Sequence, residues 1–139
     1  MRFLNRLQPL ALLVMRLALA CIMVAHGYPE VFQGGAAHMV GQVTGWGWPA
    51  WMAYLPGAAE FGGGILVGLG LVTRLAALAI LGEMAVAIWK VYWHNGLAKP
   101  GGMDLPLACA ALAFALIFFG AGLISADHLI WGRGHKAGG

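Results

Sequence analysis

Four long hydrophobic stretches occupy most of this chain, at about residues 7–25, 51–71, 75–93 and 105–124. Each is close to the ~20 apolar residues that a helix needs to cross the hydrocarbon core of a bilayer. Hydrophobic residues make up 61% of the chain and charged residues 9%, whereas soluble domains carry roughly 25% charged residues. The sequence therefore predicts an all-α membrane protein. We expect a bundle of four transmembrane helices that forms one domain over residues 1–139 and leaves no room for a soluble catalytic module.

Basic residues near the span ends indicate the orientation, because Lys and Arg concentrate in cytoplasmic loops. Five flank one side and two flank the other: Arg2, Arg6, Arg74, Arg133 and Lys136 against Lys90 and Lys99. We therefore expect a multi-pass protein of the plasma (inner) membrane with both termini cytoplasmic and with residues 27–50 and 94–104 outside. The net charge of +3 then reflects flanks beside anionic lipid, and no nucleic-acid partner is expected.

Three ionisable residues, Arg16, Glu60 and Glu83, lie near the middle of the first three spans. A charge in hydrocarbon is costly and persists only where it is paired, hydrated or used. At a rise of about 1.5 Å per residue, all three lie within ~3 Å of mid-span. We therefore expect Arg16 to pair with one glutamate, Glu83 by depth, and the other to be free to carry a proton. The three are candidate catalytic residues, and the alternative is a static ion pair that fixes the register of the bundle.

Small residues accompany both glutamates at helical spacing. In the second span, Gly57, Gly64 and Gly68 share a face with Glu60, because residues three or four apart lie on one side of a helix. In the third span, Ala79 and Ala87 flank Glu83 in the same way. Small residues let neighbouring helices approach closely in membranes. Both glutamates are therefore predicted to lie on tightly packed helix faces.

A stripe of titratable residues is predicted on the third span, since Glu83, Lys90 and His94 are seven and four residues apart and share a face. His26 ends the first span at the same outer level. Aromatic residues gather there: Tyr28, Trp46, Trp48, Trp51, Tyr54, Trp89, Tyr92 and Trp93. One interpretation is an interfacial aromatic belt. The other is a mouth for a flat, partly apolar ligand, with His26, Lys90, His94 and Trp51 as candidate binding residues.

Metal and thiol chemistry have little support in the pattern. His26 and His94 could in principle be axial haem ligands, but their spacing does not demand it, and we expect no metal site. Cys21 and Cys109 lie at similar predicted depths without a CxxC motif. They are interpreted as apolar filler, and a redox role for them stays open.

Three blocks of this sequence resemble the DoxX family. They are RLALACIMVAHGYPEVF, with Arg16 in a span that ends in His-Gly; EFGGGILVGLGLVTRLAALAILGEMAVA, with Glu60 and the Thr73-Arg74 turn; and FFGAGLISADHLI, with Gly120, Gly122, Ser125 and Asp127. Many relatives have a lysine shortly after His-Gly, where this chain has Glu30. The resemblance implies a four-helix integral membrane bundle. The family is named for a subunit of an archaeal thiosulfate:quinone oxidoreductase or terminal oxidase. Some of its relatives are linked to thiol and oxidative stress, and more distant ones resemble membrane chaperones and cargo receptors.

Two main functions follow as hypotheses. The first is a small membrane subunit of a quinone-linked redox or oxidative/thiol-stress system, in which Arg16, Glu60 and Glu83 handle protons or a quinone head group. A redox partner protein would supply the electrons, since the chain has no evident flavin, iron–sulfur or haem motif. The alternative is a non-catalytic binding, assembly or chaperone-like protein whose polar core is structural. A small transporter is less favoured because the chain shows no inverted repeat. Besides the lipid bilayer, a homo-oligomer remains open.

Overall fold

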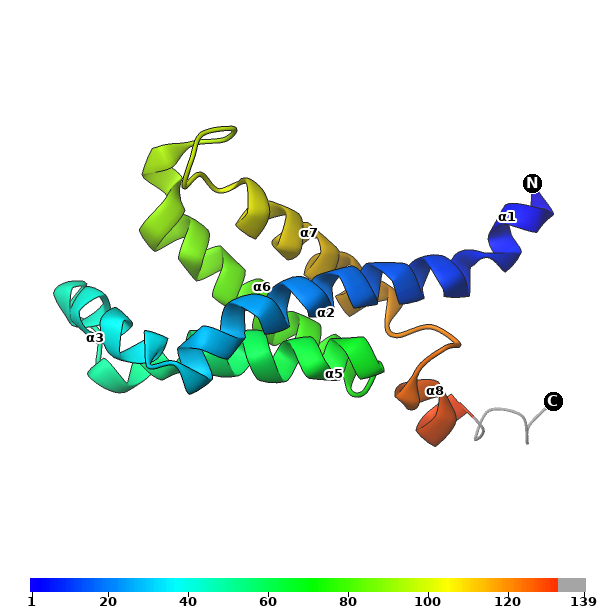
Figure 1. The fold of residues 1–139 in the computed structure, drawn as a ribbon. Helices are drawn as coiled ribbons and strands as arrows, with labels where there is room; N and C mark the ends of the chain where they lie inside the picture. Colours follow the sequence, from blue (N-terminus) through cyan, green and yellow to red (C-terminus); the bar gives the residue numbers. More distant parts are fainter. Residues whose placement is uncertain (133–139) are drawn as a thin grey trace.

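The computed structural model describes residues 1–132, which form helices joined by turns, with no strand in that range (Figure 1). The elements in chain order are α1 (Arg2–Arg6), α2 (Gln8–Phe32), α3 (Gly35–Gly45), η1 (Ala50–Tyr54), α4 (Leu55–Gly57), η2 (Ala58–Gly62), α5 (Gly63–Leu69), α6 (Thr73–Ala87), η3 (Ile88–Tyr92), η4 (Trp93–Asn95), α7 (Asp104–Phe119) and α8 (Ala126–Trp131). The all-α prediction is confirmed. Arg133 and Lys136, which entered the expected orientation, lie outside the described residues.

Three continuous helices are long and apolar enough to cross a membrane: Gln8–Phe32, Ala50–Leu69 and Thr73–Asn95. The second of them joins η1, α4, η2 and α5, and the third joins α6, η3 and η4. The fourth apolar helix, α7, has 16 residues and is shorter than the other three. The first three predicted spans are therefore present as helices of spanning length, and the fourth is present as a shorter apolar helix.

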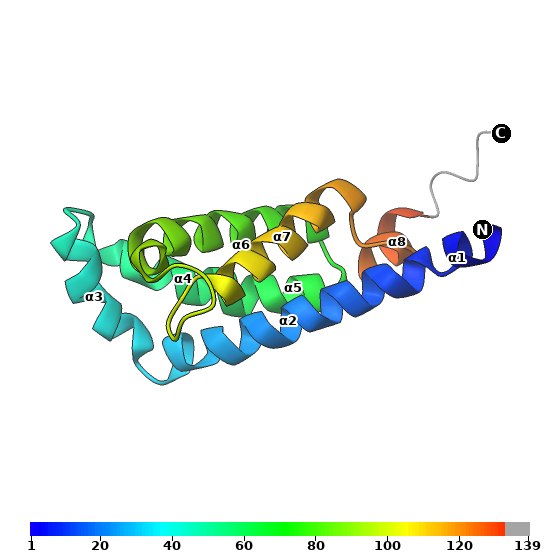
Figure 2. The same ribbon diagram turned by 90° about the horizontal axis from the view of Figure 1, so that it is seen from above.

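The long helices pack as two pairs (Figures 1 and 2). α2 packs along η2 and α5, and α6 packs along α7, while α5 and α6 are joined by a tight turn. α1 and α8 lie at one end of the bundle, and α3 lies at the other. We call these the terminal end and the loop end. Figure 1 shows the α6–α7 pair diverging from α2 and α5 toward the loop end.

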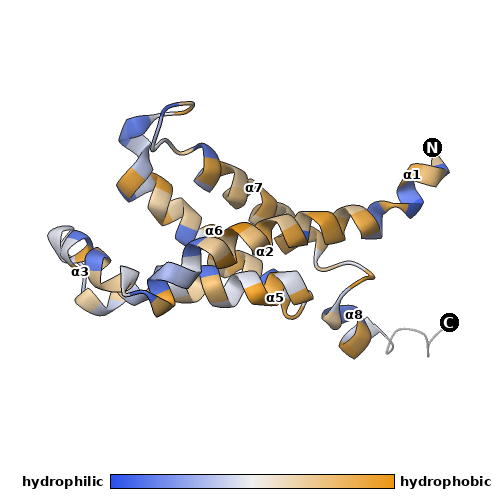
Figure 3. Ribbon diagram, in the orientation of Figure 1, coloured by the Kyte–Doolittle hydropathy of each residue, from blue (hydrophilic) through white to orange (hydrophobic). Residues whose placement is uncertain are grey.

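Packing in the bundle places small and medium side chains inside and large apolar ones outside. Leu19, Ile80 and Leu116 are fully buried at the centre, whereas Phe118 and Leu75 are more than half exposed. Figure 3 shows hydrophobic residues along all four long helices and hydrophilic ones concentrated in α1 and at the loop end. An apolar outer surface is what a helix bundle presents to lipid.

The first helix is longer than the predicted span. It runs through Pro29 to Phe32 rather than ending near residue 25, and the following connection contains the helix α3. Packing explains the extension: a Cβ on Gly27 would lie 2.5 Å from the backbone nitrogen of Phe61. Only glycine allows the helix Ala50–Leu69 to lie so close to α2. Contacts beyond the predicted span end therefore hold these residues in a helix.

The glycine face of the second span packs as predicted. A Cβ on Gly64 would lie 2.9 Å from the Cβ of Met23, and one on Gly68 would lie 3.1 Å from the Cβ of Ala20. Both contacts are with α2. The prediction of a close helix–helix approach along this glycine face is confirmed.

The corresponding prediction for the third span is wrong. Ala79 is exposed and Ala87 is half-buried. The face of α6 that packs in the core instead carries Ala77, Ile80 and Met84. The small residues around Glu83 therefore leave open space beside α6 rather than seating a neighbouring helix.

Candidate functional site

Arg16 lies at the terminal end of the core, and its guanidinium donates four hydrogen bonds. Its side chain is 1% exposed. Nε donates to the carbonyl of Val67 at 3.0 Å and Nη2 to that of Gly68 at 2.9 Å. Nη1 donates to the carbonyls of Ala121 at 2.9 Å and Ile124 at 2.6 Å. The last carbonyls of a helix have no partner within it, so Arg16 satisfies the end of α5.

The expected ion pair between Arg16 and Glu60 or Glu83 is therefore wrong: within residues 1–132 the hydrogen bonds of the Arg16 guanidinium go to backbone carbonyls. The cause is the length of α2. Because the helix runs from Gln8 to Phe32, Arg16 lies not at its centre but about 6 Å nearer the terminal end. At that depth the side chain reaches the end of α5 and not the middle of the bundle.

Asp127 completes the structure at the terminal end. Its Oδ1 accepts from Val72 N at 2.7 Å and its Oδ2 from Thr73 N at 3.0 Å, at the start of α6. Its own backbone nitrogen donates to Gly70 O at 2.8 Å. Ser125 caps α8 by accepting from His128 N. We call Arg16, Gly70, Ser125 and Asp127 the terminal knot. Its charges are satisfied by backbone groups, so its role is to hold the helix ends together.

A second group of ionisable residues consists of three glutamates from three helices. Glu30 lies on α2, Glu60 on η2 and Glu83 on α6. Glu60 is 7% exposed, and the other two are half-buried. In each of them Oε2 is buried with no hydrogen-bond partner among the described residues. We call these three residues the acid cluster.

The members of the acid cluster interact with one another. The carboxyl groups of Glu60 and Glu83 lie close to each other, and Glu30 is close enough to interact electrostatically with both. A carboxylate only accepts hydrogen bonds, whereas a protonated carboxyl can donate one. Neighbouring carboxyl groups can therefore hydrogen-bond to each other only when they share a proton. The arrangement is suited to holding and transferring a proton.

Two glycines and a wide helical turn bring the acid cluster together. A Cβ on Gly27 would lie 2.9 Å from the Cβ of Glu60, and one on Gly57 would lie 3.1 Å from the Cβ of Glu30. Each glycine thus lets the backbone of one helix approach a glutamate of the other. Glu60 itself lies in η2, a turn of π-helix just after Pro56. Such turns are frequent at functional sites.

Beside the acid cluster, an apolar groove of about 650 Å³ lies between the helix Ala50–Leu69 and α6. Most of its lining is aliphatic or aromatic, including Met52, Leu66, Trp46 and Trp48. Among the described residues that line the groove, Glu83 is the one that carries a charge. Ala79, Gly82 and Ala87 also line it, which explains why the small residues of α6 contact no neighbouring helix.

Lys90 lies at the loop end of this groove. Its ammonium group is 4.1 Å from the ring centroid of Trp89, 5.1 Å from that of Trp48 and 5.8 Å from that of Trp46. Cations within about 6 Å of an aromatic face are attracted to it. Lys90 and the two groove tryptophans therefore form a rim that is both apolar and positively charged.

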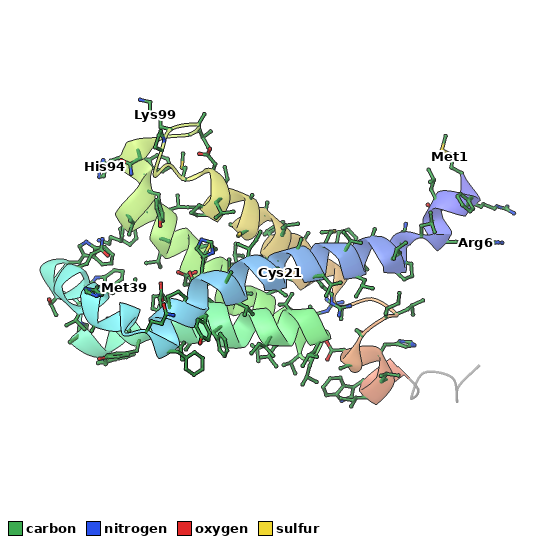
Figure 4. All side chains as sticks on the ribbon, viewed as in Figure 1. Met1, Arg6, Cys21, Met39, His94 and Lys99 are labelled. Atoms are coloured by element: carbon green, nitrogen blue, oxygen red, sulfur yellow. The ribbon has the colours of Figure 1, made fainter. Side chains whose placement is uncertain are left out.

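The other three candidate binding residues lie elsewhere. His94 borders a separate pocket with Ala85 and Trp93, and Figure 4 shows it near Lys99 at the tip of the α6–α7 pair, away from Met39 on α3. The prediction that His94 shares a face with Glu83 is wrong, because the π-helical turn η3 between them shifts the register. His26 is exposed, with Nδ1 3.0 Å from Ile22 O of its own helix. Trp51 is 62% exposed and does not line the groove.

Glu30 is the member of the site that sequence reasoning missed. The predicted first span ends near residue 25 and leaves Glu30 in the connection that follows. In the structure it lines a further pocket of about 600 Å³ together with Tyr54, Gly57 and Phe61. A signal was present: Gly27 and Glu30 are three residues apart, which places them on one helical face if the helix continues. We call the pocket that Glu30 lines the outer pocket.

The two cysteines differ in their surroundings. Cys21 is exposed on α2 and Cys109 is buried in α7, and both are free thiols. Cys109 lies close enough to Glu60 and Glu83 to interact with their charges. Within residues 1–132 no group of three or more His, Cys, Asp or Glu side chains is arranged to hold a metal ion. The chemistry that the site offers is that of carboxyl groups beside an apolar groove.

Comparison with known proteins adds one relationship. The sequence profile of a family named DoxX matches residues 11–93. This segment contains Arg16, the whole acid cluster and Lys90. No curated protein and no solved structure matches the chain.

Proposed function

The chain belongs to the DoxX family, whose profile matches more than half of its residues, and from this premise we propose that it is a small integral membrane subunit of a quinone-linked redox system. The whole chain forms one transmembrane domain in the plasma membrane. The apolar groove binds the quinone, and the acid cluster handles its protons. A partner protein exchanges electrons with the bound quinone.

The observation that carries this proposal is the pair of neighbouring carboxyl groups, Glu60 and Glu83, at an apolar groove. A volume of about 650 Å³ is within the ~300–1,000 Å³ of typical ligand pockets. A quinone is a flat ring with carbonyl oxygens and an apolar tail. Its ring can lie against Trp46 and Trp48 while one oxygen accepts a hydrogen bond from Glu83. Reduction of a quinone to a hydroquinone takes up two electrons and two protons, and the carboxyl pair is placed to deliver protons.

Quinone binding is testable by quenching of tryptophan fluorescence in detergent with decylubiquinone. We expect saturable quenching in the native chain. Ala79 and Ala111 are both exposed alanines of long helices, but only Ala79 lines the groove. Ala79→Leu should weaken binding at least about tenfold by filling an apolar pocket, and Ala111→Leu should leave it unchanged. Quenching that never saturates, or is the same in both variants, would indicate partition into the micelle and refute the proposal.

We further propose that the chain crosses the membrane four times with both termini cytoplasmic. α7 spans about 24 Å at 1.5 Å per residue, less than the ~30 Å hydrocarbon core. The chain that follows reaches α8 at the terminal end, where α1 also lies, and this supports a fourth crossing. In intact cells, a membrane-impermeant maleimide should label Gln42→Cys and not Asn5→Cys. Labelling of both from the same side would overturn the topology.

The alternative is a non-catalytic binding or assembly protein. It is favoured by α3, which lies at the loop end and exposes His38 and Gln42, four residues apart on one helical face. Such a polar helix face offers a surface to a partner protein. A purified native chain whose organic extract contains no quinone, and which shows no saturable quenching, would make this function the leading one.

A further inference from the structure

We propose that Glu30, Glu60 and Glu83 form a proton path from the outer pocket, through the interior of the bundle, to the floor of the apolar groove. The use of the proton rests on the proposed function, whereas the path itself rests on the placement of the three side chains. It assigns Glu30 as the entry, Glu60 as the buried link and Glu83 as the exit.

The two cavities are separated by a single wall. Glu30 lines the outer pocket, and Glu83 lines the groove. Ala58 and Gly62 line both cavities, and both belong to η2, the π-helical turn that also carries Glu60. Glu60 is among the lining residues of neither cavity. It belongs to the turn that forms the wall, and its side chain lies near the acid of each cavity.

The burial of Glu60 is the second observation that points to a path. Its side chain is 7% exposed, and its Oε2 is buried without a partner among residues 1–132. A buried polar atom without a hydrogen bond is costly, and a charged group in a membrane interior marks a functional pathway by default. Because the other two acids also keep an unpartnered Oε2, each member retains a free site at which to receive a proton.

The steps are simple proton transfers. Glu30 takes a proton from water in the outer pocket and passes it to Glu60. Glu60 passes it to the neighbouring carboxyl group of Glu83, and Glu83 delivers it to an oxygen of the ligand in the groove. Each step breaks one O–H bond and forms another, and no electron moves. The other titratable groups that act on the acid cluster are His26, beside Glu30 on α2, and Cys109 from α7.

The path can be tested by infrared spectroscopy of the full chain in lipid nanodiscs. The C=O stretch of a protonated carboxyl group shifts when its proton is replaced by deuterium. The chain has five acidic side chains in all, so assignment by substitution is practicable. We expect a protonated carboxyl band at neutral pH that disappears in Glu60→Gln. After transfer to D₂O, this band should shift rapidly in the native chain.

Glu30→Gln should keep the band but slow its shift by roughly 100-fold, the lower end of what a positioned acid or base contributes to proton transfer. Glu30→Asp should restore most of the rate. Asp104→Asn, which removes an exposed carboxyl on α7, is the matched control and should exchange at the native rate. Ala37→Leu provides a second test without changing an acid, because Ala37 is exposed and lines the outer pocket. It should slow the shift as well.

The absence of a protonated carboxyl band at neutral pH would overturn the path. Equal exchange rates in the native chain, Glu30→Gln and Ala37→Leu would also overturn it. The result is separable from the test of quinone binding. If exchange is slow in Glu30→Gln and Ala37→Leu but quenching does not saturate, the proton path is supported and quinone binding is refuted. If quenching saturates but exchange is unchanged in both variants, quinone binding is supported and the proton path is refuted.

Discussion

The terminal knot and the acid cluster both place ionisable side chains inside the same bundle, but they differ in how those side chains are hydrogen-bonded. In the knot, Arg16 donates to four backbone carbonyls, and Asp127 accepts from two backbone nitrogens. In the acid cluster, each of the three glutamates keeps a buried oxygen that has no hydrogen-bond partner among residues 1–132. The knot lies where helices end and backbone groups are free, whereas the cluster lies along helices whose backbone groups already bond to one another.

This difference separates two reasons for placing a charge inside a membrane protein. A charge that is hydrogen-bonded to several backbone groups can stabilise the arrangement of helix ends, and its removal leaves backbone groups unsatisfied. A charge with an unfilled site costs stability and is retained for what it binds or transfers. Burial alone does not distinguish these cases. The partners of each side chain do.

The largest effect is expected at Arg16. Arg16→Met removes the donors for four carbonyls, and breaking a buried charged network costs about 3–5 kcal/mol. The free energy of unfolding, measured by denaturant titration in detergent, should fall by that amount. Arg6→Met, which removes an exposed arginine of α1 at the same end, should leave it unchanged. Equal stabilities of the two variants would mean that the knot is not structural.

Gly70 offers the next largest effect. Both Gly70 and Gly34 have a left-handed backbone, with φ of +70° and +72°. An alanine at either therefore costs about 1–2 kcal/mol of backbone strain. At Gly70 the added Cβ would also lie 2.5 Å from the Cβ of Ser125 and 2.7 Å from Nη2 of Arg16, whereas nothing lies within 4 Å at Gly34. Gly70→Ala should therefore lower the free energy of unfolding by a further ~1–3 kcal/mol, the cost of overpacking. No difference between the two variants in thermal unfolding would contradict this contact.

Asp127→Asn should have a moderate effect. In an asparagine an NH₂ donor replaces one of the two carboxylate oxygens, so one of the two backbone nitrogens at the start of α6 loses the oxygen that it bonds in the native chain. Loss of a helix cap costs about 0.5–2 kcal/mol, and we expect a lower melting temperature in detergent. Asp104→Asn is the control, since the exposed Asp104 accepts one bond, from Ala98 N, and should change stability by less than ~0.5 kcal/mol. If Asp104→Asn lowered the stability more than Asp127→Asn does, the structural role of Asp127 would be contradicted.

The smallest effect on stability is expected in the acid cluster. Glu60→Gln and Glu83→Gln should each change the free energy of unfolding by less than ~1 kcal/mol, because each removes a carboxyl group that is incompletely hydrogen-bonded and can keep the contact with its neighbour through the new amide. The same titration as for Arg16 measures this. A loss near ~3 kcal/mol in either variant would place that glutamate with the knot as an architectural residue.

The sequence by itself determined the class of protein, the family and the glycine face of the second span. Hydrophobic stretches of spanning length and a low charge content indicate a helical membrane protein, and this conclusion does not depend on how the helices pack. Gly64 and Gly68 could be placed on a packing face because helical spacing is a local property. Arg16, Glu60 and Glu83 could be singled out as exceptional for the same reason: the cost of a charge in lipid depends on the residue and its depth.

Only the tertiary structure decided the partners of these residues. Arg16 bonds to carbonyls rather than to a glutamate because α2 extends to Phe32, and contacts through Gly27 hold that extension, which residues 7–25 alone do not reveal. The same extension brings Glu30 to the site. His94 leaves the face of Glu83 because η3 is a wide turn, and a wide turn changes every later side-chain direction without a local signature. A side chain finds its partner through the neighbouring helix, and the position of that helix is set by packing over the whole bundle.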